Sequence, residues 1–195
     1  MGMRAIFEEI WRLAKPYLDT RKNDIHTEIA VRFAKKLLET EGGDENVVMP
    51  AIILHDVGWI KVPENEQHMG FGPEIQSSNV MKKHEREGVH IAQDILKAVH
   101  YDMDKIPEIL DIIKGHDSRE ESRSMNDSVV KDADRLWRFS REGFNIDCDR
   151  FNLEPMERVK KRDLDIEKIF FTESAKRIAR KEIKERIEES KSERK

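Results

Sequence analysis

Four histidines of this 195-residue sequence lie on or directly after helical segments that also carry apolar core residues: His26, His55, His84 and His116. Imidazole nitrogens and carboxylate oxygens are common protein ligands of divalent transition metals. Cys148 is the single cysteine, which excludes a thiolate zinc cluster and an intramolecular disulfide and points to a reducing compartment. A metal bound by this protein must therefore be held by histidines and carboxylates.

The dipeptide His55-Asp56 is the most informative pair, because it directly follows an apolar run that ends at Leu54. A carboxylate in the last turn of a helix faces the negative end of the helix dipole. This costs about 0.3–1 kcal/mol when the group is exposed, and more when it is desolvated. A cation beside Asp56 would turn this free-energy cost into a gain. A divalent metal therefore explains why a carboxylate and a neutral imidazole occur together at this position.

A second acidic pair, Asp132 and Asp134, lies within an apolar helical pattern. Two side chains that are two residues apart on a helix point in different directions, so we expect only one of them to face the core. With His26, His55 and Asp56, that aspartate would complete a nitrogen and oxygen ligand set that leaves positions for water and substrate. Such a set suits manganese, iron, nickel, cobalt or zinc.

In this order, the residues resemble the motifs of the HD-domain superfamily of metal-dependent phosphohydrolases. The resemblance covers roughly residues 24–140 and rests on three segments: Ile25-His26-Thr27, His55-Asp56-Val57-Gly58 and Ala133-Asp134-Arg135-Leu136. The last segment is similar to the one in which several branches of the superfamily place the final ligand. The resemblance therefore favours Asp134 as the ligand, with Asp132 as its competitor.

The resemblance implies that metal-activated water hydrolyses a phosphomonoester or phosphodiester, with a nucleotide as the leading candidate. Asp56 and Asp134 would then act in catalysis as well as in metal binding, and Lys61, beside the His-Asp turn, is a further catalytic candidate that would contact phosphate. His84 and His116 occupy positions at which binuclear branches add ligands. Together with Arg119 they are candidates for a second metal or for the substrate phosphate.

Two other functions stay open. Branches that act on deoxynucleotides or guanosine tetraphosphate carry acidic residues soon after the His-Asp pair, whereas this sequence reads Trp59-Ile60-Lys61. A regulatory module that binds metal or nucleotide without turnover is therefore an alternative. The same set of residues also resembles the di-iron oxygenases of the superfamily. The segment Gly115-His116-Asp117-Ser118 lacks the Gly-Tyr-Pro loop of the cyclic dinucleotide phosphodiesterases, which argues against that substrate.

Apolar residues recur at helical spacing along almost the whole chain, and no segment shows sustained strand-like alternation. The predicted fold is therefore all-α, an HD-domain-like helical bundle. Helices are expected over residues 7–14, 24–41, 45–57, 80–99, 106–113 and 127–139, with Asp44 as the cap of the third. The stretch from Gly58 to Asn79 is expected to be a loop that is functional or mobile.

Residues 1–150 form the predicted HD-type domain, and residues 151–195 a helical extension. The extension is expected to contain one long amphipathic helix from Asp163, with a polar tail that frays beyond Ile187. A solvated helix is the simplest interpretation, and a homodimerisation or nucleic-acid arm is the alternative. The net charge of -4 provides no overall basic field for nucleic acid. No apolar run approaches the ~18 residues of a membrane span, so we expect a cytoplasmic protein with a small-molecule substrate.

Overall fold

The structure is a computed structural model that describes residues 3–71 and 76–192, and within these ranges it contains helices and turns but no strand. The all-α prediction is confirmed. The α-helices are α1 (Ala5–Ala14), α2 (Asn23–Glu41), α3 (Glu45–Leu54), α4 (Glu64–Gln67), α5 (Ser78–Ala98), α6 (Ile106–Lys114), α7 (Met125–Leu136), α8 (Arg141–Phe151), α9 (Pro155–Ile169) and α10 (Glu173–Ser192). Short 3₁₀ turns occupy Lys15–Tyr17, Val57–Lys61, His68–Gly70 and Trp137–Phe139.

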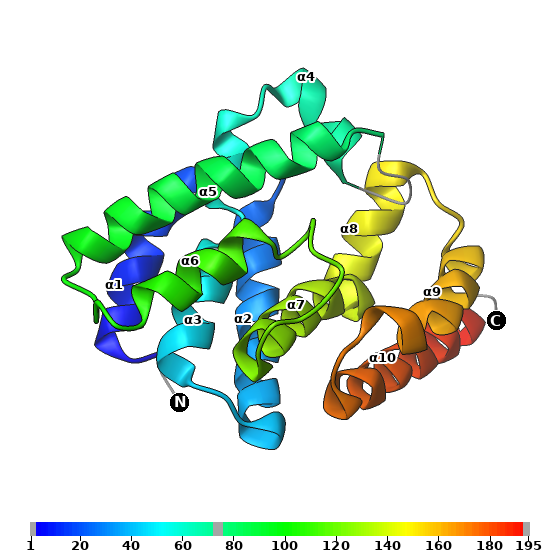
Figure 1. The fold of residues 1–195 in the computed structure, drawn as a ribbon. Helices are drawn as coiled ribbons and strands as arrows, with labels where there is room; N and C mark the ends of the chain where they lie inside the picture. Colours follow the sequence, from blue (N-terminus) through cyan, green and yellow to red (C-terminus); the bar gives the residue numbers. More distant parts are fainter. Residues whose placement is uncertain (1–2, 72–75, 193–195) are drawn as a thin grey trace.

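Helix α3 forms the centre of the bundle, because every residue from Val47 to Leu54 is buried. A helix that is apolar on all sides needs neighbours on all sides, and α3 contacts α1, α2, α6 and α7 (Figure 1). Asp44 caps it as predicted, by accepting a hydrogen bond of 2.8 Å from the amide of Asn46. Because α3 ends inside the core, His55 and Asp56 follow it at a buried position.

Two helix pairs surround α3 and carry the other candidate residues. Helices α2 and α7 pack against each other and against α3, whereas α5 and α6 form a second pair in which α6 contacts α3 (Figure 1). His26 lies in the first turn of α2, and Asp134 in α7. His84 lies in α5, and His116 follows the end of α6.

The predicted loop between Gly58 and Asn79 contains short helical turns up to Gly70, so its described part is more ordered than expected, and residues 72–75 lie outside the described residues. The turn Val57–Lys61 packs closely on α5. Gly58 permits this approach, since a Cβ there would collide with the backbone of His84 and Gly88. As a result the ring of Trp59 stacks on that of His84, with centroids 4.0 Å apart and planes at 11°.

The long C-terminal helix is α10, and the predicted start near Asp163 is wrong, because α9 ends at Ile169 and α10 begins at Glu173. A buried carboxylate on α7 explains the break. Asp132 accepts hydrogen bonds from the amides of Phe171 and Thr172, at 2.9 and 2.8 Å, and from the Thr172 hydroxyl at 2.8 Å. It thereby binds the backbone directly before α10 and fixes that helix against α7.

Helix α10 continues beyond Ile187 to Ser192, and the end of the predicted frayed tail, residues 193–195, lies outside the described residues. Helix α10 packs on α9 and also contacts α2 and α7 (Figure 1). In the described part of the chain, no helix has both the length and the apolar character needed to cross a bilayer.

Candidate metal centre

Three ligand atoms from three different helical segments converge at the first part of the site. The Nε2 atoms of His26 and His55 are 2.9 Å apart, and Oδ1 of Asp134 lies 3.0 and 3.5 Å from them. Oδ2 of Asp56 is 3.7 and 3.8 Å from the same nitrogens. Two ligands that each bind an ion at about 2.1 Å lie about 3 Å apart when their bonds are perpendicular. The spacing therefore suits a shared cation.

The other oxygen of Asp56 faces a second group of ligand atoms. Oδ1 of Asp56 is 3.5 Å from Nε2 of His116 and 3.9 Å from Nε2 of His84, and these two nitrogens are 3.3 Å apart. Oδ2 of Asp117 completes the group at 3.5 Å from His84 and 3.7 Å from His116. Asp56 thus lies between two ligand groups with one oxygen toward each, an arrangement compatible with divalent metal binding at adjacent positions.

Backbone carbonyls determine which ring nitrogen of two histidines faces the site. Nδ1 of His55 lies 2.7 Å from the carbonyl oxygen of Ile52, and Nδ1 of His116 lies 2.8 Å from that of Ile113. When each Nδ1 donates its proton to that carbonyl, the Nε2 lone pair is left to face the site. Such a bond to the second ring nitrogen is the usual way in which proteins orient a metal-binding histidine.

The charges within the cluster keep the two central carboxylates ionised. Burial favours the neutral form, but the neighbouring histidines outweigh it and hold the pKa values of Asp56 and Asp134 well below their usual range. Desolvation lowers the pKa of His26, and it lowers that of His84 to about 4. Anionic carboxylates and neutral imidazoles are the forms that bind a divalent cation.

His116 behaves differently from His84. Desolvation opposes its protonation, but the carboxylates of Asp117, Asp56 and Glu85 raise the pKa of His116 to about 10. Since this value lies above the ordinary histidine pKa of about 6.5, protonated His116 stabilises the metal-free fold fully below about pH 6.5. This contribution is lost as the pH rises toward the folded-state pKa.

A bound cation must displace the proton of His116 and any proton on His55, where desolvation opposes protonation but the carboxylates of Asp56 and Asp134 also raise the pKa. We therefore expect metal binding near neutral pH to release at least about one proton per chain. Titration calorimetry in buffers with different ionisation enthalpies measures this release. Binding heats that do not depend on the buffer would show that both histidines are already neutral in the metal-free protein.

The structure brings Asp134, and not Asp132, to the other candidate ligands, because Asp132 faces the start of α10.

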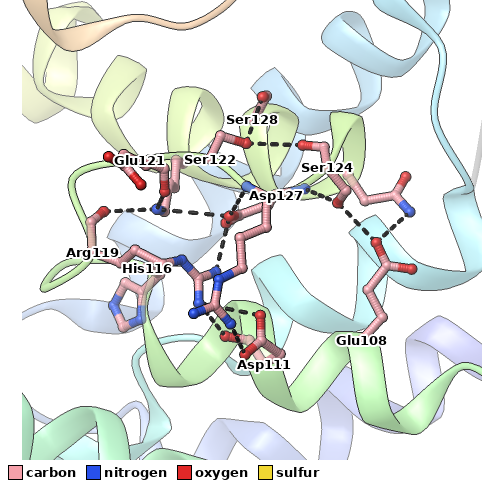
Figure 2. A network of polar contacts seen from close by, with 12 residues as sticks. Glu108, Asp111, His116, Arg119, Glu121, Ser122, Ser124, Asp127 and Ser128 are labelled. Carbon is pink, nitrogen blue, oxygen red and sulfur yellow. Dashed lines mark hydrogen bonds and ion pairs between the residues drawn. The ribbon is translucent and has the colours of Figure 1, made fainter.

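Lys61 is exposed, and the guanidinium of Arg119 binds Asp111 and Asp127 at 3.1 and 2.9 Å (Figure 2). Neither Lys61 nor Arg119 is among the described residues that line the cavity at the cluster. The geometry therefore gives no direct support to a phosphate contact by Lys61 or Arg119.

A buried polar network holds the segment that carries His116 and Asp117. Nζ of the buried Lys131 donates hydrogen bonds of 2.7 Å to the carbonyl oxygens of Arg119 and Glu121. Glu85 on α5 accepts bonds from the amides of Asp117 and Ser118, at 3.0 and 2.8 Å. Figure 2 shows Arg119 between Asp111 and Asp127, beside His116. These bonds fix the turn after α6 from both sides.

A small cavity that is partly open to solvent lies against the cluster. Its lining includes four of the clustered residues and three arginines that the sequence did not single out: His26, Asp56, Asp117, Asp134, Arg21, Arg138 and Arg150. Asp117 had a signal in the sequence, because His116-Asp117 repeats the His55-Asp56 dipeptide. The arginines had none, since they come from the turn before α2, the 3₁₀ turn after α7, and α8.

Comparison with known proteins agrees with the arrangement of these residues. Residues 23–138 match the family of HD domains. A crystal structure from an uncultured Thermotogales bacterium, described as a predicted HD superfamily hydrolase, has the same fold, with a TM-score of 0.63 at 18% sequence identity. The match covers 95% of this chain and 89% of that chain. No curated protein gives a significant match.

Proposed function

Because the chain belongs to the HD-domain family, we propose that it is a metal-dependent phosphohydrolase that cleaves a phosphomonoester or phosphodiester, with a nucleotide as the leading candidate. The position of Asp56 carries this proposal. Its two oxygens face two groups of buried ligand atoms, at the edge of a cavity that also contains three arginines. Metal ions held by these ligands and the guanidinium groups of the cavity would both attract a phosphate ester.

The donor set of imidazoles and carboxylates, without a thiolate, fits manganese, iron, cobalt, nickel or zinc. His26, His55 and Asp134 would hold one ion, and His84, His116 and Asp117 a second, with Asp56 shared between them. Bound there, the metal would make hydroxide available from water near neutral pH and neutralise charge on the phosphoryl oxygens.

The protein's own residues orient the reactants. Asp117 is the least buried of the clustered carboxylates, with 33% of its side chain exposed, so it can contact both water and the buried histidines. We assign its other carboxylate oxygen, Oδ1, the acceptance of a proton from the attacking water, while Oδ2 faces the two histidines. Asp117 would thereby replace the acidic residues that other branches carry after the His-Asp pair. Asp134 orients the water from the opposite side, and the rings of Trp59 and Trp137 limit access of bulk solvent beside His84 and His26.

The experiment that tests this proposal is phosphate release from a panel of nucleotides and simple phosphate esters, after loading with manganese, iron, cobalt, nickel or zinc. We expect turnover in the loaded protein, loss of turnover after chelation, and recovery when the metal returns. The exposed variant Arg12→Gln serves as a control and should behave as the wild type, since Arg12 is exposed on α1 and does not line the cavity. A metal-loaded protein that releases no phosphate from any member of the panel would contradict the proposal.

The paired ligand groups also fit the di-iron oxygenase alternative, and the same loaded samples distinguish it. About two irons per chain with a mixed-valence paramagnetic signal, and oxygen consumption in place of phosphate release, would favour an oxygenase. A regulatory module would be indicated by a nucleotide that raises the melting temperature but is not hydrolysed. The arginines of the cavity favour phosphate chemistry over oxygen activation.

A further inference from the structure

The cavity beside the cluster contains N–H donors that lack acceptors. Nε and Nη1 of Arg21, Nδ2 of Asn23 and Nε1 of Trp137 are buried and have no hydrogen-bond partner among the described residues. All three residues line the cavity. Buried donors without a partner are rare in folded proteins, so a group of them in one cavity calls for an explanation. A ligand rich in acceptor oxygens would satisfy them together.

Arg21 is held in place by aromatic rings. Its guanidinium carbon lies 3.9 Å from the ring centre of Trp59 and 3.5 Å from that of Phe71. Stacking occupies the faces of a planar guanidinium and leaves its N–H edge available for acceptors. No carboxylate of the described residues forms an ion pair or hydrogen bond with it, whereas the buried Arg158 binds Asp147 at 2.6 Å.

The backbone at Arg21 is also held in an unfavourable conformation. Arg21 and Lys22 have φ angles of 54° and 58°, in the left-handed region that residues with a Cβ rarely occupy. Nη2 of Arg150 donates a hydrogen bond to the carbonyl oxygen of Arg21 and so ties α8 to this turn. Such conformations cluster at functional sites, where the surrounding structure maintains them.

The charges around the cavity favour an anionic ligand. Three arginines and three aspartates line it, Arg138 also pairs with Asp147 at 3.9 Å, and each bound divalent ion would add two positive charges. Burial lowers the pKa of Arg21 to about 9, and Arg150 and Arg138 contribute to this shift even though Asp56 opposes it. Arg21 is still charged at neutral pH, and a bound anion would relieve the repulsion among the three guanidinium groups.

We propose that Arg21, Arg138 and Arg150 form a subsite for the terminal phosphate of a phosphomonoester, and that this subsite selects monoesters over diesters. The inference rests on the proposed function, since it concerns the same cavity. A phosphomonoester carries nearly two negative charges and three terminal oxygens at neutral pH. A diester carries a single charge and has a substituent in place of one terminal oxygen, so it offers the N–H donors of the cavity fewer charged acceptors.

The experiment compares inorganic phosphate, which has no ester bond, with dimethyl phosphate, a diester whose methoxide groups leave poorly. The two ligands differ in charge, and the absence of methanol release is checked in the same samples. Binding to the metal-loaded protein is measured by titration calorimetry for the wild type, Arg21→Gln, Arg21→Lys and the exposed control Arg12→Gln. We expect wild type and control to bind phosphate at least about 10-fold more tightly than dimethyl phosphate. Arg21→Gln should lose at least about 10-fold in phosphate affinity, because charge-assisted hydrogen bonds are lost.

Arg21→Lys keeps the charge but not the planar donor edge, so we expect it to bind phosphate more weakly than the wild type and more tightly than Arg21→Gln. All variants should keep the wild-type metal content, because Arg21 is not among the clustered ligand atoms, and this content also reports correct folding. Equal phosphate affinity in wild type, Arg21→Gln and Arg21→Lys would overturn the subsite. So would equal binding of phosphate and dimethyl phosphate by the wild type.

Turnover separates this inference from the proposed function. The paired substrates are 4-nitrophenyl phosphate and its methyl diester, which share one leaving group. We expect kcat/KM to favour the monoester, and Arg21→Gln to reduce that preference. A metal-loaded protein that hydrolyses neither ester but binds phosphate in an Arg21-dependent way would contradict the proposed hydrolase function and support the subsite. If Arg21→Gln hydrolyses both esters at the wild-type rates, the proposed hydrolase function is supported and the subsite is refuted.

Discussion

Replacing Asp56 with Asn is expected to lower phosphate release by at least about 100-fold and to leave less than one metal ion per chain. Asp56 is the residue whose oxygens face both ligand groups, at 3.7 Å from Nε2 of His26 and 3.5 Å from Nε2 of His116. Loss of partners that only orient metal ligands already costs about 10- to 100-fold in affinity or activity. A shared carboxylate should matter more, because its charge opposes the repulsion between two adjacent cations.

The fold should tolerate this change. Asp56 Oδ1 accepts a hydrogen bond of 3.0 Å from the indole of Trp59, and an Asn side-chain oxygen can accept the same bond. Metal content by elemental analysis and phosphate release are measured side by side, with the exposed Asp163→Asn as the matched control. If Asp56→Asn retains two ions and wild-type turnover, the shared role of Asp56 is excluded.

Substitutions of the two aspartates of α7 are expected to affect different properties, since Asp132 supports the stability of the fold and Asp134 supports metal binding. Asp132→Ala should lower the free energy of unfolding by about 3 kcal/mol, because a fully buried carboxylate that accepts three hydrogen bonds is lost and each buried group left without a partner costs about 1–3 kcal/mol. The bonds join α7 to the start of α10, so we expect that helix to detach most readily. Metal content should stay unchanged when measured on the folded protein.

Asp134→Ala should instead lose metal and turnover, with a smaller effect on the metal-free fold. Its oxygen contacts Nε2 of His26 at 3.0 Å and Nε2 of His55 at 3.5 Å, and no backbone group of the described residues donates a hydrogen bond to it. Urea unfolding of the metal-free variants and elemental analysis of the loaded ones provide the comparison. Loss of metal in Asp132→Ala with retention in Asp134→Ala would reverse the assignment of the two residues.

Local patterns in the sequence were sufficient to predict the helical class and the positions of most helices. They also singled out the four histidines and the His-Asp dipeptide that come together in the fold. Helical periodicity and capping residues such as Asp44 act within a few residues of the chain, so they can be recognised without the fold. The resemblance to HD domains, which rests on the order of these residues, then favoured Asp134 as the final ligand and His84 and His116 as positions for a second metal. Their roles as metal ligands stay predictions until an ion is measured.

Only the tertiary structure decided the features that depend on which helices meet. The resemblance favoured Asp134 over Asp132, but helical spacing alone did not separate them. In the fold, Asp132 binds Thr172 at the start of α10, and Asp134 faces His26. The same bonds divide the expected C-terminal helix into α9 and α10. Arg21 reaches the cavity because two left-handed residues turn the chain there. Side-chain direction in these cases follows from contacts between distant segments, which no local pattern contains.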